Sequence, residues 1–339
     1  MILYDPHIPV SLHEFGILIP IRDSRTTRTI SALKSDPMLG AIEKRWHRDH
    51  IDETLSRDDV LRVHSPGYVE RLFSDKLEEE ITSIYELIDP DGHYHRYAPD
   101  KATRPLSDLF HRILLKAAGS AQSARLAMET GFCFYFAGGM HHAYADHGSG
   151  FCPVNDIVIA ARKLQHEQKV RNVWIIDVDA HKGDGTAALT AGDASIRTLS
   201  IHMARGWPLD AAPTLPDGSF NPVFTPSDID IPMESGEEKH YTQRLEQGLQ
   251  RLKEAGPADL AIVVCGADPY EKDELPSTAG LRLSLSQMLE RDRLVYHFLE
   301  KQNVPATFLM AGGYGEETWR VYTQFLDWVL KTRYGRRGD

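Results

Sequence analysis

VWIIDVDAHKGDGT, residues 173–186, is the stretch that decides the fold of this chain. Its first four residues are bulky and apolar, which predicts a buried strand. Asp177, Asp179 and His181 follow at every second position, so on a strand they would all point to one side. Buried charges must be paired or bind a metal. By itself, the stretch is therefore compatible with a salt-bridged strand end or with a divalent-metal site.

The sequence around this stretch alternates predicted strands and helices. We expect strands at residues 133–136, 196–203, 260–265 and 306–310, and helices at 106–130, from Asn155, at 237–255, 286–303 and 316–333. This alternation predicts an α/β fold in which a mostly parallel sheet lies between two helical layers, a three-layer αβα architecture. No linker divides the predicted α/β core, residues 106–335, so we expect a single domain over 1–339.

Residues 1–100 differ from the rest because they are rich in Pro, Asp and His. We expect this part to be largely irregular, with short helices around 40–48 and 57–73 and a break at Pro66. The turn-rich segment 89–97 is interpreted as a solvated loop that could also form the rim of a pocket.

The composition excludes several classes of protein. The formal net charge of −11 argues against a dedicated nucleic-acid partner. No apolar run reaches the length of a membrane span, and the N-terminus lacks the basic and apolar regions of a secretory signal. Cys133, Cys152 and Cys265 are too far apart to form a disulfide framework. We therefore expect a cytoplasmic protein without membrane or nucleic-acid contacts, and the sequence sets no oligomeric state.

Polar clusters follow four of the predicted strands. They are His141-His142, then Asp177, Asp179, His181 and Asp184, then Gly266-Ala267-Asp268, and finally Gly312-Gly313-Tyr314. In a parallel sheet the carboxyl ends of the strands share one edge, so these clusters can meet. Asp179, His181 and Asp268 would then supply the three ligands of a catalytic zinc site, which keeps one position open for water.

The remaining members of the clusters have the right chemistry for hydrolysis. Zinc lowers the pKa of a bound water and polarises a carbonyl group. His141, His142 and Tyr314 are candidates for the base, the acid and the oxyanion donor. Asp177 and Asp184 are then candidates for the acceptors that orient the histidines.

The motifs FAGGMHHA, GSGFCPVND, IIDVDAHKGDG, SIH, GAD and AGGY occur in this order. Together they resemble the zinc-dependent histone deacetylase family, which has the arginase–deacetylase fold, over residues 58–320. The short form AGGY is most similar to the class IV branch and its bacterial relatives. The resemblance implies that the chain removes acetyl or longer acyl groups from the ε-amine of lysine. It implies Zn²⁺ at Asp179, His181 and Asp268, and Fe²⁺ is possible because the same ligands suit it.

The resemblance also implies a role for each remaining polar residue. His142 would act as general base and then as acid, held by Asp184. His141, paired with Asp177, would support the water and the transition state electrostatically. Tyr314 would donate a hydrogen bond to the substrate carbonyl oxygen.

Two further sites are implied by the resemblance. The tunnel for the acyl-lysine side chain would be lined by Gly150, Phe151, Trp207, Leu275, Gly312 and Gly313. A structural K⁺ or Na⁺ would be bound by Asp177, by Asp179 and His181, and by the segment Ser200-Ile201. The resemblance also implies an internal product channel with an arginine, which would correspond to Arg25 or Arg28.

Three alternatives remain at the level of the sequence. The substrate could be an acetylated polyamine or another small amide. Polyamine-selective relatives carry a glutamate where this chain has Leu275, but Glu274 is adjacent, so a shift of one residue would change the inference. A ureohydrolase with two manganese ions would need more bridging carboxylates than the segment around Asp268 offers. A non-catalytic acyl-lysine-binding protein would have no need of the complete set of catalytic residues.

Overall fold

The computed structural model describes residues 1–335, and its centre is an eight-stranded sheet in which every pair of neighbouring strands is parallel. The strand order is β2-β1-β3-β8-β7-β4-β5-β6. The strands are β1 (Ile2–Leu3), β2 (His47–Arg48), β3 (Phe132–Tyr135), β4 (Val173–Asp177), β5 (Ile196–Met203), β6 (Ile229–Met233), β7 (Leu260–Val264) and β8 (Ala306–Leu309). The predicted α/β fold with a parallel sheet is confirmed. The last four residues of the expected 1–339 domain lie outside the described part.

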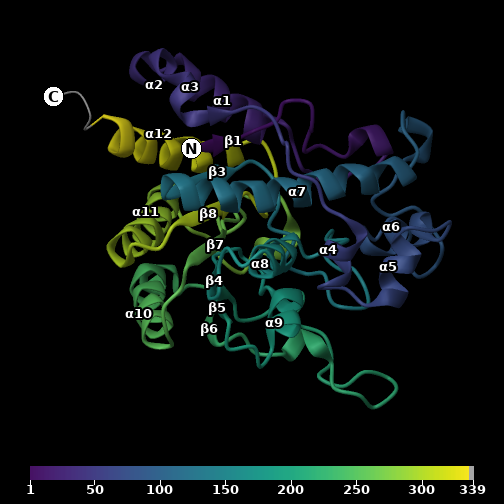
Figure 1. Cartoon of the computed structure of the whole chain (residues 1–339). Coiled ribbons are helices and arrows are strands. Elements are labelled where there is room, and N and C mark those ends of the chain that lie inside the picture. The colour runs from purple at the N-terminus through teal and green to yellow at the C-terminus, as the bar shows by residue number, and fades with distance from the viewer. Residues whose placement is uncertain (336–339) are drawn as a thin grey trace.

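Helices cover both faces of the sheet, and a third group packs beside it (Figure 1). One face is covered by α1 (Ser24–Ser35), α10 (Tyr241–Glu254), α11 (Leu285–Gln302) and α12 (Thr318–Tyr334), and the other by α7 (Ser107–Thr130), α8 (Asp156–His166) and α9 (Asp184–Thr190). The remaining helices are α2 (Pro37–Ala41), α3 (Glu43–Trp46), α4 (Arg57–Leu61), α5 (Pro66–Leu72) and α6 (Leu77–Ile84). The three layers therefore correspond to the αβα architecture expected from the sequence.

Local signals explain where several of these helices begin and end. Asn155 caps α8, because its side-chain oxygen accepts a hydrogen bond from the backbone N–H of Val158 at 3.1 Å. Gly131 ends α7 with φ of 80°, a left-handed conformation that glycine adopts without strain. Ser284 and Gln287 form a capping box at the start of α11.

The N-terminal part is more regular than its sequence suggests. It contains α1 to α6 and the two-residue strands β1 and β2, which extend the sheet beyond β3. Strands of two residues leave no periodicity to detect. The break predicted at Pro66 separates α4 from α5. The sheet of the α/β core thus includes strands from outside residues 106–335.

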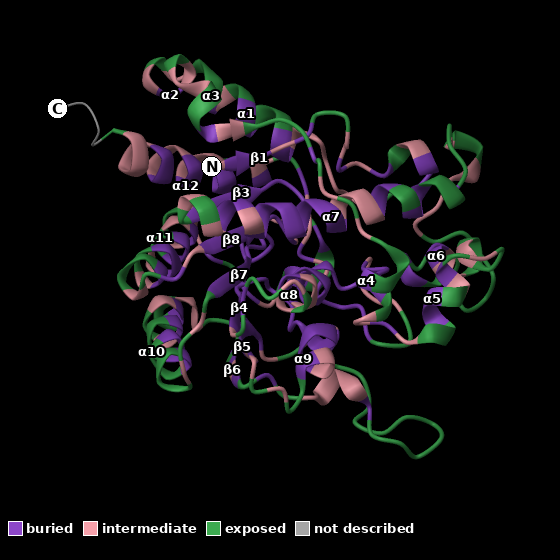
Figure 2. Ribbon diagram, viewed as in Figure 1, coloured by how far each residue is buried: buried purple, intermediate pink, exposed green. Residues whose placement is uncertain are grey.

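Buried residues gather along the sheet and on the helices beside it (Figure 2), and the buried apolar side chains form one layer on each face of the sheet. All five residues of β4 and all five of β7 are buried, as expected for central parallel strands covered on both faces. A third buried cluster joins α4, α5 and α6 to the first half of α7. Within residues 1–335, no helix is long and apolar enough to cross a membrane.

Candidate metal centre and substrate pocket

The strand order places four polar clusters at one edge of the sheet. Strands β3, β8, β7 and β4 are consecutive neighbours, so the loops that follow their carboxyl ends converge. These loops carry the His141-His142 pair, Tyr314, Asp268 and the Asp179–His181 segment. One difference from expectation concerns β4, which ends at Asp177, so Asp179 and His181 lie in the loop before α9 and do not continue the strand.

Asp179, His181 and Asp268 form a buried cluster whose ligand atoms all lie within 4.8 Å of one another. The Nδ1 atom of His181 lies 3.3 Å from Asp179 Oδ1 and 3.2 Å from Asp268 Oδ2. Its Nε2 atom lies 3.2 Å from Ser277 Oγ, a partner that fixes the ring so that Nδ1 faces the carboxylates. One imidazole nitrogen and two carboxylates are a donor set suited to Zn²⁺.

Electrostatics and the shape of the surrounding backbone fit a cation at this point. Burial, followed by the charge of Asp179, raises the pKa of Asp268 to about 7, so the two carboxylates repel each other. Gly312 lies so close that a Cβ atom there would come within 2.5 Å of Asp268 Oδ2 and 2.6 Å of Asp179 Oδ2. A Cβ at Gly266 would likewise overlap the Asp179 carboxylate. Glycines thus leave room around the ligand oxygens that any other residue would fill.

The two adjacent histidines are held by different carboxylates. His141 Nδ1 lies 2.7 Å from Asp177 Oδ2, and His142 Nδ1 lies 2.6 Å from Asp184 Oδ1. Asp184 also accepts a hydrogen bond from the hydroxyl of Tyr144 at 2.8 Å. Each histidine therefore has its Nδ1 atom fixed by an acceptor, which leaves Nε2 for chemistry.

The surroundings separate the two histidines electrostatically. Burial lowers the pKa of His141, but the charges of Asp177 and Asp179 outweigh it and raise the pKa to about 9. Burial and the charge of His141 lower the pKa of His142 to about 4, despite its contact with Asp184. His141, which is charged at neutral pH, is suited to an electrostatic role, and His142, which is neutral, is suited to act as a base.

Tyr314 lies beside both histidines in the lining of the pocket. Its backbone N–H donates a 2.7 Å hydrogen bond to Asp273 Oδ2. Burial, then the charges of Asp268 and Asp179, raise the pKa of its hydroxyl, which stays protonated and able to donate.

An outer pocket of about 170 Å³ leads to these residues. It is lined by Glu86, Arg96, His142, Gly150, Phe151, His181, Trp207, Leu275, Ser277 and Tyr314. The Trp207 ring centroid lies 4.5 Å from that of His142. The lining thus includes four of the residues expected in the tunnel. Gly312 instead lines an inner chamber, and Gly313 lines neither cavity because its Cβ position faces Thr318 and Ala267.

Of the residues expected to bind a monovalent cation, Asp177, Ser200 and Ile201 lie on two adjacent strands, and Asp179 and His181 lie in the loop after the first of them. Asp177 of β4 is in register with Ser200 of β5, and Ile201 follows on the same buried strand. Asp177 Oδ1 accepts a hydrogen bond from the backbone N–H of Asp179 at 3.1 Å. Ser200 Oγ lies 2.9 Å from His202 Nδ1. A K⁺ or Na⁺ ion at this place stays a prediction.

The two candidate channel arginines lie in different environments. Arg25 is buried and lines the inner chamber, and its Nη1 donates to the carbonyl oxygens of Ala311 and Gly313 at 3.1 and 3.0 Å. Arg28 is 53% exposed and pairs with Glu316. The structure therefore places Arg25, and not Arg28, beside the site.

Several site residues were not identified from the sequence. They are Tyr144, Asp273, Ser277 and, in the inner chamber, Lys116. Asp273, an acid five positions after Asp268, is the one for which the sequence offered a signal. The contacts of Tyr144, Ser277 and Lys116 depend on how segments distant in the chain fold together.

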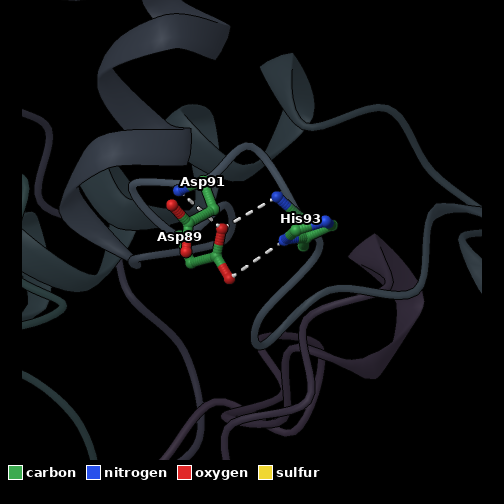
Figure 3. Close-up of side chains that lie close together, drawn as sticks. All are labelled: Asp89, Asp91 and His93. Carbon is green, nitrogen blue, oxygen red and sulfur yellow. Dashed lines mark hydrogen bonds and ion pairs between the residues drawn. The ribbon is translucent and has the colours of Figure 1, made fainter.

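A second group of possible metal ligands lies at the surface. Asp89, Asp91 and His93 are close together on the loop after α6 (Figure 3). Asp89 Oδ1 accepts hydrogen bonds from the backbone N–H groups of Asp91 and His93 at 3.0 and 2.8 Å. These bonds close a turn of the kind that Asp forms in loops, and they account for the cluster without a metal.

Comparisons with known proteins find a matching family model and several similar chains. A family model described as the histone deacetylase domain matches residues 19–329. An uncharacterized protein of Picosynechococcus sp. is 31% identical over 206 residues, which cover 60% of this chain and 63% of that protein. Histone deacetylase 2 of Arabidopsis thaliana is 24% identical over 326 residues, covering 96% of this chain and 77% of the relative.

A bacterial relative with a different name is also similar. The acetoin utilization protein AcuC of Staphylococcus aureus is 28% identical over 280 residues, 78% of this chain and 65% of AcuC. The alignments span 63–77% of the length of these three curated relatives.

Proposed function

Because the chain belongs to the histone deacetylase family, we propose that it is a zinc-dependent amidohydrolase that removes an acetyl or longer acyl group from the ε-amine of lysine. One observation carries this proposal. Asp179, His181 and Asp268 form one buried cluster, and its member His181 lines the outer pocket together with His142 and Tyr314. Three metal ligands, a base and a hydroxyl donor around one cavity are the parts that amide hydrolysis needs.

Asp179, His181 and Asp268 would hold the metal, Zn²⁺ with Fe²⁺ as the alternative, which would supply Lewis acidity at this point. His142, neutral because of its low pKa, takes a proton from the attacking water and returns it to the amine that leaves. His141, kept protonated by Asp177 and Asp179, stabilises negative charge on the oxygen of the tetrahedral intermediate. The Tyr314 hydroxyl donates to the same oxygen.

The outer pocket supports a lysine side chain as the group that enters. Phe151, Trp207 and Leu275 give it apolar walls that match the methylene groups of lysine. Gly150 has φ of 52°, and a Cβ there would lie 2.7 Å from His142 Cδ2, so the wall approaches the base closely. The same narrow passage also accepts the methylene chain of a small acylated amine.

The position of Glu274 bears on the polyamine alternative. Leu275 lines the outer pocket, whereas Glu274 turns away from it, pairing with Arg22 at 3.3 Å and accepting a hydrogen bond from the backbone N–H of Glu316 at 2.9 Å. Leu275 offers no partner for a second cationic amine, and Glu86, the acid in the lining of the outer pocket, is already paired with Arg96. We therefore favour acyl-lysine peptides over acetylated polyamines.

A Tyr314→Phe variant tests the catalytic role directly. We expect hydrolysis of an acetyl-lysine peptide to fall by roughly 10²-fold or more, the size typical for the loss of one oxyanion donor. Metal content measured on the same sample is expected to be unchanged, because Tyr314 is not a ligand. A variant that keeps full activity would contradict the mechanism.

A substrate panel tests the class of amide. Acetyl-lysine peptide, a long-chain acyl-lysine peptide and acetylspermidine are compared by kcat/KM on the wild-type enzyme. The proposal expects an acyl-lysine peptide to be preferred to acetylspermidine. Preference for acetylspermidine would move the function to small amides, and a metal-free chain without turnover would indicate a non-catalytic binding protein.

A further inference from the structure

An inner chamber adjoins the metal ligands and extends into the protein between α7 and the N-terminal segment. It shares His142, Gly150, Phe151, His181 and Tyr314 with the outer pocket. Its volume is about 110 Å³. For comparison, a cavity that holds one water molecule needs roughly 10–15 Å³. The inner chamber therefore has room for a short chain of a few heavy atoms beyond the reacting carbonyl.

The walls of the chamber are mostly apolar, but two cations reach them. Apolar side chains include Leu12, Leu109 and Ile113, and the cations are Arg25 and Lys116. Two backbone carbonyls occupy one nitrogen of Arg25, while its buried Nε atom has no hydrogen-bond partner. The ammonium of Lys116 forms neither a hydrogen bond nor an ion pair with any residue of the described chain.

Among residues 1–335, the acids that line the chamber are limited to a metal ligand. Asp179 is the one acidic residue in its lining, and that carboxylate belongs to the metal-ligand cluster. Asp23 lies nearby, but its Oδ1 accepts hydrogen bonds from the backbone N–H groups of Val10 and Ser11 at 2.8 and 2.9 Å. Arg25 is buried and Lys116 is partly buried. Removing cations from water without a partner is costly, so an anion in the chamber would be stabilised.

The surroundings of Lys116 also favour a bound anion. Burial, followed by the charges of Arg112 and Arg25, lowers its pKa to about 7, and the charge of Asp23 opposes this shift. Arg112 is itself paired with Glu14. An anion bound next to Lys116 would favour the charged form of the amine.

We infer that the inner chamber binds the terminal carboxylate of a short dicarboxylic acyl group, so that the enzyme acts on succinyl- or glutaryl-lysine. The inference rests on the proposed function, because the same site breaks the amide bond. Water adds its oxygen to the acyl carbon, the C–N bond breaks, the lysine amine takes the proton, and the dicarboxylate leaves. A neutral acyl chain would leave Arg25 and Lys116 without an anionic partner. A long fatty acyl chain is too large for the volume of the inner chamber.

The test compares three peptides that differ in the acyl group alone: acetyl-lysine, succinyl-lysine and the neutral isostere of succinyl, its terminal amide. Kinetics are measured on the zinc-loaded wild type and on Lys116→Met, which keeps the length of the side chain and removes its charge. Lys116→Arg restores a cation. Lys169→Met, at an exposed lysine in the turn after α8, is the control for loss of one charge.

We expect the wild type to prefer succinyl over its terminal amide. In Lys116→Met, the ratio of kcat/KM for succinyl to that for acetyl should fall roughly tenfold or more, as for a lost bond to a charged group. Lys116→Arg should recover most of the ratio, and Lys169→Met should keep it. Equal losses for succinyl and acetyl, or hydrolysis of acetyl without succinyl, would overturn the inference and leave the proposed function intact.

Measurements of ligand binding test the carboxylate site independently of peptide hydrolysis. Succinate and butanoate are titrated calorimetrically into the same zinc-loaded proteins, since butanoate lacks the second carboxylate. Tighter binding of succinate that is lost in Lys116→Met supports the carboxylate site, even if no peptide is hydrolysed and the proposed function fails. Equal affinities would overturn it. Lys116→Met could change inhibition by acetate without changing the ratio of kcat/KM for succinyl to that for acetyl. The chamber would then bind the acid released by the reaction, which also overturns the inference.

Discussion

At the scale of single residues, the carboxylate of Asp184 illustrates how one contact defines a role. It accepts from His142 at 2.6 Å, from Tyr144 at 2.8 Å and from the backbone N–H of Gly185 at 2.9 Å. Because Asp184 is fully buried, this network is protected from water, and its hydrogen bonds fix both the ring orientation and the tautomer of His142.

Asp184→Asn should therefore impair catalysis without removing the metal. We expect kcat/KM for an acetyl-lysine peptide to fall on the order of 10²-fold or more, because an amide no longer stabilises the charged imidazole. Tyr144→Phe is the matched control, since it removes a different hydrogen bond of the same carboxylate and should cost at most about tenfold. Equal effects of the two variants would show that Asp184 acts through folding alone.

The glycines around the metal ligands give a second prediction at this scale. A methyl group at Gly312 would approach the carboxylates of Asp179 and Asp268 too closely for both to stay in place. Gly312→Ala should therefore weaken metal binding, measured by competition with a chelating dye. Gly67→Ala, in α5 where no atom lies within 4 Å of the added carbon, should leave metal affinity as it is. Unchanged affinity in Gly312→Ala would contradict the assigned ligands.

Single residues also show which parts of the site could be predicted from the sequence. Asp179, His181 and Asp268 stand out because charge follows apolar strands, and the structure brings them together. Ser277 and Lys116 carry no such signal, because a serine in a loop and a lysine in a helix are common. Their positions follow from the packing of elements distant in the chain.

At the scale of elements, α11 supports the strand ends that carry the ligands. Arg291 is fully buried, and its Nη1 donates to the carbonyl oxygens of Val178 and Gly266 at 3.0 and 2.8 Å. Its Nε donates to Asp292 Oδ1 at 2.8 Å. Val178 directly precedes Asp179, so this guanidinium fixes the backbone next to a metal ligand.

Arg291→Met should destabilise the protein strongly. Removing one partner of a buried ion pair leaves Asp292 and two carbonyls unpaired, which costs about 3–5 kcal/mol in the free energy of unfolding. Arg293→Met, on the same helix but exposed and stacked 4.6 Å from the Trp328 ring, should cost about 1 kcal/mol or less. Denaturant titration measures both. Equal stability of the two variants would sink this account of α11.

Elements also limit what the sequence can predict. Long helices and five-residue strands follow from periodicity and from caps such as Asn155. The end of β4 at Asp177 does not, because the alternation of polar and apolar residues continues through His181, four residues beyond the end of the strand. Likewise β1 and β2 become strands by pairing with neighbours distant in sequence.

At the scale of the whole molecule, strand order turns separate motifs into one site. The sequence predicts parallel strands, but not that β3, β8, β7 and β4 are consecutive. That order arises because later strands insert between earlier ones through helical crossovers. It brings residues as distant as His142 and Tyr314 to one pocket.

Dependence on a metal tests the central claim most directly. The purified chain is stripped with a chelator, its metal content is measured, and hydrolysis of an acetyl-lysine peptide is followed during titration with Zn²⁺. We predict that activity disappears with the metal and returns at a single equivalent of Zn²⁺. We also predict that Asp268→Ala neither binds zinc tightly nor recovers activity. Full hydrolysis by the metal-free chain would contradict the account.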